Sequence, residues 1–285
     1  MADQAENLRE LVGKKHEIRV VSVSSGKGGV GKSSISVNLA IAISRLGVRV
    51  LVVDADFGLA NVDVMLGVTT KYDVSHFLSG KRTLQEIIQL GHEGVRFISG
   101  GSGVKDLLDM DEDQLAGLLS GLVRLEAPID FIIIDTGAGI NETVMQLILA
   151  SSETIVVITP EPTSILDAYA LVKTIVKRDA THPVHVLINK SENKKEAQRV
   201  QEGFIEIVGR HLGKNANPLG IIAYDQDVPK SIKRQIPITV SDPGSLTARE
   251  IERIAMALLD LPAEKASGSL LSRMFSRLLG DRENA

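Results

Sequence analysis

A glycine-rich loop that contains two lysines is the stretch of this sequence best suited to chemistry. It follows the apolar run 18–23 and ends in Gly31-Lys32-Ser33. Glycines let backbone N–H groups approach phosphate oxygens without a Cβ in the way, and the spacing from Gly26 to Ser33 is that of a phosphate-binding loop. Lys32 would reach the β- and γ-phosphates, and Ser33 would ligate Mg²⁺. The residues predicted to hold the nucleotide here are Gly26, Lys27, Gly28, Gly29, Val30, Gly31, Lys32, Ser33 and Ser34.

The loop carries a second lysine, Lys27, directly after its first glycine. From the outer lip of the loop, the Lys27 ammonium could reach phosphates held by a second copy of the chain. The pattern Lys-Gly-Gly-x-Gly-Lys-Ser resembles the deviant Walker A signature of the MinD/ParA class of ATPases, which dimerise face to face around two ATP molecules. The resemblance implies that ATP and Mg²⁺ are cofactors, that the protein is a homodimer with ATP, and that Lys27 acts catalytically in trans beside Lys32. A surface lysine in a glycine turn with no nucleotide is the alternative.

A second predicted strand, 48–53, ends in two aspartates. Because Asp54 and Asp56 alternate along an extended chain they share a face, so one could help to hold Mg²⁺ while the other orients the attacking water. The segment from Asp54 to Asp63 resembles the switch I motif of MinD-like proteins. This implies a metal role for Asp54, a water-positioning role in catalysis for Asp56 and a nucleotide contact for Asn61. Alternatively, these aspartates cap the next turn.

The run 129–134 is the most apolar in the chain and precedes Asp135. Hydrophobic residues followed by an aspartate form the Walker B arrangement, in which Asp135 binds Mg²⁺, usually through water. The Gly-Ala-Gly turn that follows resembles the switch II segment of the same family, so Gly139 would hydrogen-bond the γ-phosphate. Many relatives have proline where this chain has Gly137, which makes the turn looser.

Residues at two later strand ends are predicted to contact the base. In MinD/ParA proteins an asparagine at the position of Asn189 hydrogen-bonds adenine, and by the same resemblance Tyr224 and Asp225 would belong to the pocket. Relatives usually have proline where this chain has Ala223. A turn asparagine is the alternative for Asn189, and the lysine-rich stretch 190–199 is more typical of a solvated helix face than of a binding site.

Apolar runs of strand length alternate with amphipathic helical patterns along most of the chain. This alternation predicts an α/β fold with a doubly wound, mainly parallel sheet flanked by helices, and with the nucleotide at the carboxyl ends of the strands. The resemblance adds that the fold is that of the MinD-like P-loop NTPases, in the SIMIBI class. We divide the chain into an N-terminal helix (1–15), a MinD-like ATPase domain (16–262), and a linker with a C-terminal amphipathic helix (263–285).

The composition limits the possible cofactors and partners. The 285 residues include no cysteine, which excludes disulfides and cysteine-ligated zinc or iron–sulfur sites. A formal net charge of −4 argues against nucleic acid as a partner. No apolar run approaches the roughly 20 residues of a membrane span, and the acidic N-terminus is not a secretory signal. We therefore expect a cytoplasmic protein.

The N-terminal residues Asp3, Gln4, Ala5, Leu8 and Arg9 resemble the leading motif of the FlhG group (also called FleN or YlxH) of MinD-like ATPases. In that group the motif activates the partner GTPase FlhF, an SRP-type protein, with its glutamine thought to enter the catalytic site. The resemblance implies this role for Gln4 here, with Asp3, Leu8 and Arg9 as its companions. A frayed terminus is the alternative.

The segment 270–279 is predicted to form an amphipathic helix. At 100° per residue its apolar residues fall on one half of a helical wheel and its serines and arginines on the other. It resembles the membrane-targeting helix that ends MinD and FlhG proteins, which implies reversible attachment to the anionic inner face of the cytoplasmic membrane. Packing on its own domain or on a partner protein is the alternative. The apolar residues are Leu270, Leu271, Met274, Phe275, Leu278 and Leu279.

Together these features resemble an FlhG-type ATPase over nearly the whole chain. The resemblance implies slow, dimer-dependent ATP hydrolysis, and control of flagellar number and placement through FlhF and the flagellar switch or C-ring proteins. A MinD-type division-site regulator, a ParA-type DNA-partition ATPase and a non-catalytic nucleotide-binding scaffold are the alternatives.

Overall fold

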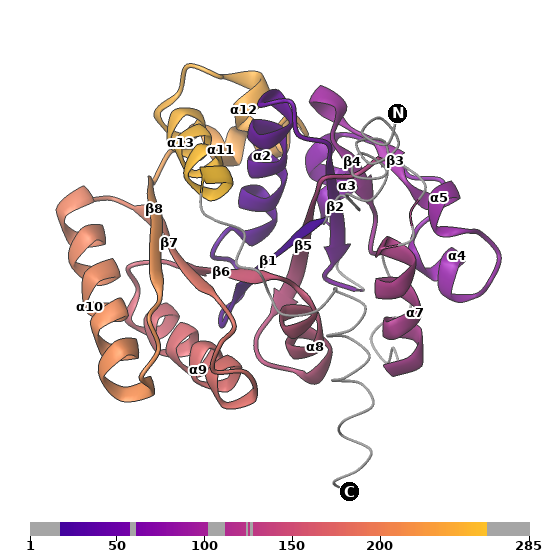
Figure 1. Cartoon of the computed structure of the whole chain (residues 1–285). Helices are drawn as coiled ribbons and strands as arrows, with labels where there is room; N and C mark the ends of the chain where they lie inside the picture. The colour runs from indigo at the N-terminus through magenta and orange to yellow at the C-terminus, as the bar shows by residue number, and fades with distance from the viewer. Residues whose placement is uncertain (1–17, 58–60, 102–111, 124, 126–127, 261–285) are drawn as a thin grey trace, which may run out of the picture.

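An eight-stranded sheet forms the centre of the computed structural model (Figure 1), which describes residues 18–57, 61–101, 112–123, 125 and 128–260. The strand order is β3-β4-β2-β5-β1-β6-β7-β8, and neighbouring strands are parallel except for β3 and β4. The predicted doubly wound, mainly parallel sheet is therefore confirmed. The strands are β1 (Arg19–Ser25), β2 (Val50–Ala55), β3 (Gln89–Leu90), β4 (Arg96–Ile98), β5 (Phe131–Ala138), β6 (Glu153–Ile158), β7 (Val184–Ser191) and β8 (Asn217–Ala223).

Helices cover both faces of the sheet (Figure 1). Helices α2 and α13 pack on one face, and α7, α8, α9 and α10 pack on the other. The described helices are α2 (Lys32–Arg45), α3 (Val62–Leu66), α4 (Val74–Leu78), α5 (Leu84–Ile87), η1 (His92–Gly94), α7 (Glu112–Val123), α8 (Glu142–Ala150), α9 (Pro162–Arg178), α10 (Lys194–Leu212), α11 (Asp227–Lys233), α12 (Ile238–Ser241) and α13 (Leu246–Asp260).

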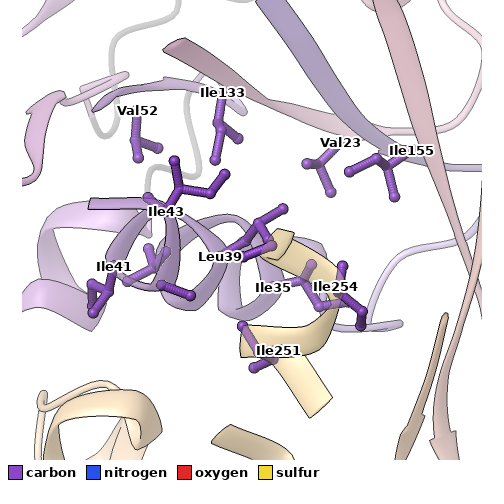
Figure 2. Packing of buried hydrophobic residues seen from close by; sticks show 14 of the residues in the cluster. Val23, Ile35, Leu39, Ile41, Ile43, Val52, Ile133, Ile155, Ile251 and Ile254 are labelled. Carbon is purple, nitrogen blue, oxygen red and sulfur yellow. The ribbon is translucent and has the colours of Figure 1, made fainter. Parts of the chain in front are cut away.

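Helix α2 is anchored by its apolar face. Ile35, Leu39 and Ile43 recur every four residues, so they lie on one side of the helix, and all three are buried. Burial of each such side chain contributes about 1.5–3 kcal/mol. This packing fixes the helix whose first turn follows the glycine loop. The strand residues that the helix faces are Val23, Val52, Ile133 and Ile155 (Figure 2).

Two strands extend past their predicted ends. The predicted run 129–134 corresponds to β5, which begins at Phe131 and continues to Ala138, so Asp135 lies inside the strand. The pairing continues because Ser25 of β1 still faces Ala138 after a register shift. Strand β7 likewise continues to Ser191, so Asn189, predicted to stand at a strand end, lies inside the strand. Most polar residues at these ends are buried, and a pattern of apolar residues does not reveal them; the buried ones are Asp135, Thr136, Asn189 and Ser191.

The two terminal segments predicted from the sequence lie outside the described residues. These are the motif around Gln4 in residues 1–15 and the amphipathic segment 270–279. In the part of the chain that the structure describes, no helix has the length and apolar character to cross a membrane.

Candidate functional site

The glycine loop connects the end of β1 to the start of α2, as predicted. Gly29 and Gly31 have φ angles of 79° and 99°, a conformation that suits glycine. Gly26 is required for a different reason, since a Cβ there would lie 2.3 Å from the backbone of Asp167 in the second turn of α9. The loop is therefore shaped by its own turns and by close packing against a helix more than 130 residues away in sequence.

Lys32 is a buried cation at the first position of α2. It is 7% exposed, and burial lowers its pKa, while the charges of Asp135 and Asp56 act in the opposite direction. The structure thus brings together three of the residues predicted for the site, from the loop, from the segment after β2 and from β5. The positive end of the α2 dipole adds to the attraction for an anion.

Asp135 has one carboxylate oxygen free to take a ligand. Its Oδ1 accepts a hydrogen bond from Ser36 Oγ at 2.9 Å, whereas Oδ2 is buried with no hydrogen-bond partner among the described residues. Burial raises the pKa of Asp135 to about 6, although the hydroxyls of Ser33 and Ser36 and the charge of Lys32 act to lower it. Mg²⁺ prefers oxygen ligands and uses one or two carboxylates beside phosphate oxygens. The free oxygen of Asp135 near Ser33 fits that ion.

Asp54 makes the contacts of a turn cap. Its Oδ2 accepts hydrogen bonds from the backbone N–H groups of Asn61 at 2.8 Å and Val62 at 3.0 Å, and Oδ1 accepts from the N–H of Asp56 at 3.2 Å. Burial, followed by the charge of Asp135, raises the pKa of Asp54 to about 8. The alternative of a capped turn therefore describes the contacts of Asp54, and its role as a metal ligand stays a prediction.

Asp56 lies just beyond β2 and is half-buried. Burial raises its pKa, and the charge of Lys32 lowers it. A Cβ on Gly137 would lie 3.3 Å from Asp56 Oδ1, so the segment after Asp135 passes directly against this carboxylate. Asn61 is exposed, and its backbone N–H, as noted, is bound to Asp54.

Lys27 contacts its own chain in this structure. Its Nζ donates to Glu161 Oε2 at 2.6 Å and to Thr163 Oγ1 at 3.0 Å, both near the start of α9. The predicted γ-phosphate donor Gly139 is also occupied, because its N–H donates to the carbonyl of Ser25 at 2.9 Å. Lys27 would have to leave Glu161 and Thr163 to act on a partner's phosphate. Gly139 would have to leave Ser25 to bind a γ-phosphate.

The predicted base-binding residues fall into two sets. Asn189 is 8% exposed and adjoins the loop, donating from Nδ2 to the carbonyl of Val30 at 2.7 Å, and its contact with adenine stays a prediction. Tyr224 is 54% exposed. Asp225 accepts hydrogen bonds from Thr247 Oγ1 and from the backbone of the α11 segment. The structure therefore brings only the first set against the phosphate loop.

Four residues of the site were missed by sequence reasoning. Ser36 lies one helical turn after Ser33, a spacing that could have indicated a shared face of α2. The other three reach the loop from distant elements, for which the chain offers no local pattern. The missed residues are Ser36, Glu161, Thr163 and Lys190.

Comparisons with known proteins agree with this geometry. Residues 21–238 match the family model described as the CobQ/CobB/MinD/ParA nucleotide binding domain. The antiactivator FleN of Pseudomonas aeruginosa is 34% identical over 251 residues, which cover 88% of this chain and 90% of FleN. The flagellum site-determining protein YlxH of Helicobacter pylori is 31% identical, with 96% of this chain and 94% of YlxH covered. A solved structure of MinD complexed with Mg-ADP from Pyrococcus horikoshii OT3 has a TM-score of 0.72 and 26% identity, covering 88% of this chain and 100% of that chain.

The parallel sheet, the loop after β1 and the charge interaction between Lys32 and Asp135 define a nucleotide-binding protein of the P-loop type. Both flagellar relatives exceed 30% identity over at least 88% of the chain. This chain belongs to the MinD/ParA family of nucleotide-binding ATPases, in the FlhG group that includes FleN and YlxH.

Proposed function

We propose that this protein is an ATP-dependent, dimerising ATPase that regulates the number and placement of flagella. The observation that carries the proposal is the convergence of Lys32, Asp56 and Asp135 at the phosphate loop. That cluster supports nucleotide chemistry, and the relatives named antiactivator FleN and flagellum site-determining protein YlxH support the flagellar role.

Nucleotide binding would use groups that already lie together at the phosphate loop. The loop N–H groups and the start of α2 attract phosphate, and Lys32 supplies a full charge. Ser33 Oγ and the free Oδ2 of Asp135 would hold Mg²⁺ directly or through water, with Asp54 behind them. When bound, the metal would neutralise charge on the β- and γ-phosphates.

Asp56 would orient the attacking water. Phosphoryl transfer to water needs a nucleophile held in line with the leaving group. Burial raises the pKa of Asp56 and so makes its carboxylate a better hydrogen-bond acceptor, while the nearby charge of Lys32 favours the ionised form. A half-buried carboxylate at the edge of the loop can therefore hold one water at the terminal phosphate.

Lys27 would act on the nucleotide of the partner copy. Its side chain is 38% exposed and its contact with Glu161 lies on the outside of the molecule, so a second chain can reach it. In the dimer the ammonium would exchange Glu161 for a partner phosphate and stabilise charge that develops as the bond breaks. Turnover would then be slow and dimer-dependent, because one chain lacks this cation at its own phosphates.

The terminal segments would connect this cycle to its partners. The motif containing Asp3 and Gln4 would activate FlhF, and the segment 270–279 would bring the protein reversibly from the cytoplasm to the anionic membrane. Two weak amphipathic helices in one dimer bind a surface far more firmly than one. Flagellar switch or C-ring proteins would be further partners.

Sizing the full chain with Mg²⁺ and ATP, ADP or a non-hydrolysable ATP analogue, with and without anionic liposomes, tests the proposal. We expect a dimer that sediments with liposomes only with ATP or the analogue. A monomer under every condition would overturn the dimer mechanism, and nucleotide binding without phosphate release would indicate a scaffold.

A MinD-type division role is the second candidate, and the similarity to the MinD structure with bound Mg-ADP supports it. Measuring the GTPase rate of FlhF with the full chain separates the two. Stimulation that is lost in Gln4→Ala would support the flagellar role, and an unchanged rate would favour the division role. Salt-dependent retention on non-specific DNA would instead favour a ParA-type protein.

A further inference from the structure

Lys190 lies near the carboxyl end of β7 with its side chain against the phosphate loop. Its Nζ donates a hydrogen bond to the carbonyl oxygen of Gly29 at 2.6 Å, although the two residues are 161 positions apart. The preceding residue, Asn189, holds the carbonyl oxygen of Val30 in the same way. Two consecutive residues of one strand therefore hold two consecutive carbonyls of the loop.

The backbone at Lys190 has a conformation that lysine rarely adopts. Its φ angle is 56°, one of three positive values at non-glycine positions among the described residues. The pairing of β7 with β8 also shifts register between Ile188 and Ser191. A left-handed lysine persists only where the surrounding fold imposes it, and such residues are concentrated at functional sites.

Gly31 provides the space for this contact. A Cβ on Gly31 would lie 2.5 Å from Asn189 Nδ2 and 3.8 Å from Lys190 Cε. Within a planar trans peptide unit the C=O and the following N–H point in opposite directions. Holding the carbonyls of Gly29 and Val30 therefore turns the next two N–H groups away from Asn189 and Lys190. Successive N–H groups that point to one side form an anion-binding concavity.

Lys190 also interacts electrostatically with Glu161, the residue that pairs with Lys27 beside the loop. The pKa of Glu161 is lowered first by its hydrogen bond and charge interaction with Lys27, and further by the charge of Lys190. Two cations from different elements therefore face one carboxylate beside the loop. Lys190 does not depend on Glu161 for its position, since its hydrogen bond goes to Gly29.

We propose that Lys190 is a positioning residue for nucleotide binding: its ammonium holds the Gly29 carbonyl and keeps the loop N–H groups directed at the phosphates before the nucleotide arrives. The inference rests on the nucleotide binding in the proposed function, but not on dimerisation or hydrolysis. Lys190 therefore differs from an ordinary solvated lysine at the start of the stretch 190–199, because it should set affinity for phosphate without taking part in the chemical step.

The test compares Lys190→Asn with Lys190→Arg and with Lys194→Asn. Asparagine tolerates the left-handed backbone but lacks the ammonium, and arginine keeps a cationic donor. Lys194 is an exposed lysine at the start of α10, so Lys194→Asn makes the same charge change away from the loop. The measurements are the Kd of Mg-ADP by calorimetry, kcat and KM for ATP, and amide hydrogen exchange of the nucleotide-free loop.

We expect Lys190→Asn to weaken Mg-ADP binding by about three- to tenfold, the range of one ordinary hydrogen bond, because the Lys190 side chain is exposed to solvent. KM for ATP should rise, whereas kcat should stay within about twofold of the parent value. The loop amides should exchange faster. Lys190→Arg and Lys194→Asn should resemble the parent in all of these measurements. Unchanged affinity and exchange in Lys190→Asn, or an equal loss in Lys194→Asn, would overturn the inference. If Lys190→Asn does not fold, the parent protein still tests the inference. Fast exchange of the loop amides in the nucleotide-free parent would show that the loop is not held in place, and would overturn the inference. A parent that binds no nucleotide would instead overturn the proposed function.

Discussion

The floor and the outer lip of the phosphate loop are held by different forces. The floor, which we define as Lys32, Asp54 and Asp135, is at most 7% exposed. The lip, defined as Lys27 and Glu161, has side chains that are 38% and 60% exposed. A buried charge is costly to separate from its partners, whereas an exposed ion pair contributes about 0–1 kcal/mol. The floor is therefore in place before any ligand binds, and the lip is the part that can change partners.

Lys27→Ala is expected to have the largest effect. It removes the cation of the lip and leaves the three residues of the floor unchanged. Turnover should fall about 100-fold or more, because a cation that stabilises transferring phosphate is lost, while the Kd of Mg-ADP changes by less than about threefold. Phosphate release and calorimetry measure the two quantities. Lys32→Ala is the comparison and should lose nucleotide affinity. Equal losses of affinity in both variants would show that Lys27 belongs to the floor.

Asp56→Ala should separate binding from hydrolysis. Loss of the residue that orients water should lower kcat by up to about 100-fold and leave the dimer with ATP bound. The variant should therefore remain on anionic liposomes after ATP is added, as co-sedimentation over time would show. A variant that stays monomeric with ATP would contradict this prediction.

The floor should also make the stability of the nucleotide-free protein depend on pH. The raised pKa of Asp54 means that the folded chain keeps a proton that the unfolded chain releases above about pH 4. Stability from this group is complete below that pH and declines as pH rises toward about 8, by at most about 1.4 kcal/mol per pH unit. Asp54→Asn cannot titrate and should flatten the decline in urea unfolding. The exposed Asp242→Asn is the control, and an equal slope in both variants would refute the assignment.

Glu161→Gln should give the smallest effect and would sharpen the comparison at the lip. Without the carboxylate, Lys27 is released from its own chain, so the concentration for half-maximal dimerisation with an ATP analogue should fall about two- to fivefold. Sedimentation velocity measures it. Glu206→Gln removes a carboxylate from an exposed pair with Arg210 and is the matched control. Weaker dimerisation in Glu161→Gln would show that the carboxylate itself serves the dimer.

The sheet and the loop could be predicted because their signals are local. Uninterrupted apolar runs indicated buried parallel strands, and the glycine spacing indicated the phosphate loop at the end of the first of them. The end of β5 was not predictable in the same way. Asp135 continues the strand through its pairing with Val23 and Asp54, and polar residues of this kind look like loop in sequence.

Contacts between distant elements account for what the sequence did not reveal. Asn189 and Lys190 reach loop carbonyls about 160 positions away, so neither the contact nor the left-handed backbone has a pattern in the chain. For Asp54 the sequence left capping and metal binding open, and only the positions of the amides of Asn61 and Val62 distinguish the observed contacts.

If Gly139 binds the γ-phosphate as predicted, its hydrogen bond to Ser25 would have a consequence for nucleotide selection. A ligand that recruits this N–H must first displace a backbone carbonyl, and a diphosphate has no terminal oxygen in that place with which to do so. The bond would therefore act as a threshold that one additional phosphate overcomes. Breaking this bond would separate the segment before α8 from β1. The ATP-bound and ADP-bound forms of the protein would then differ in the position of this segment.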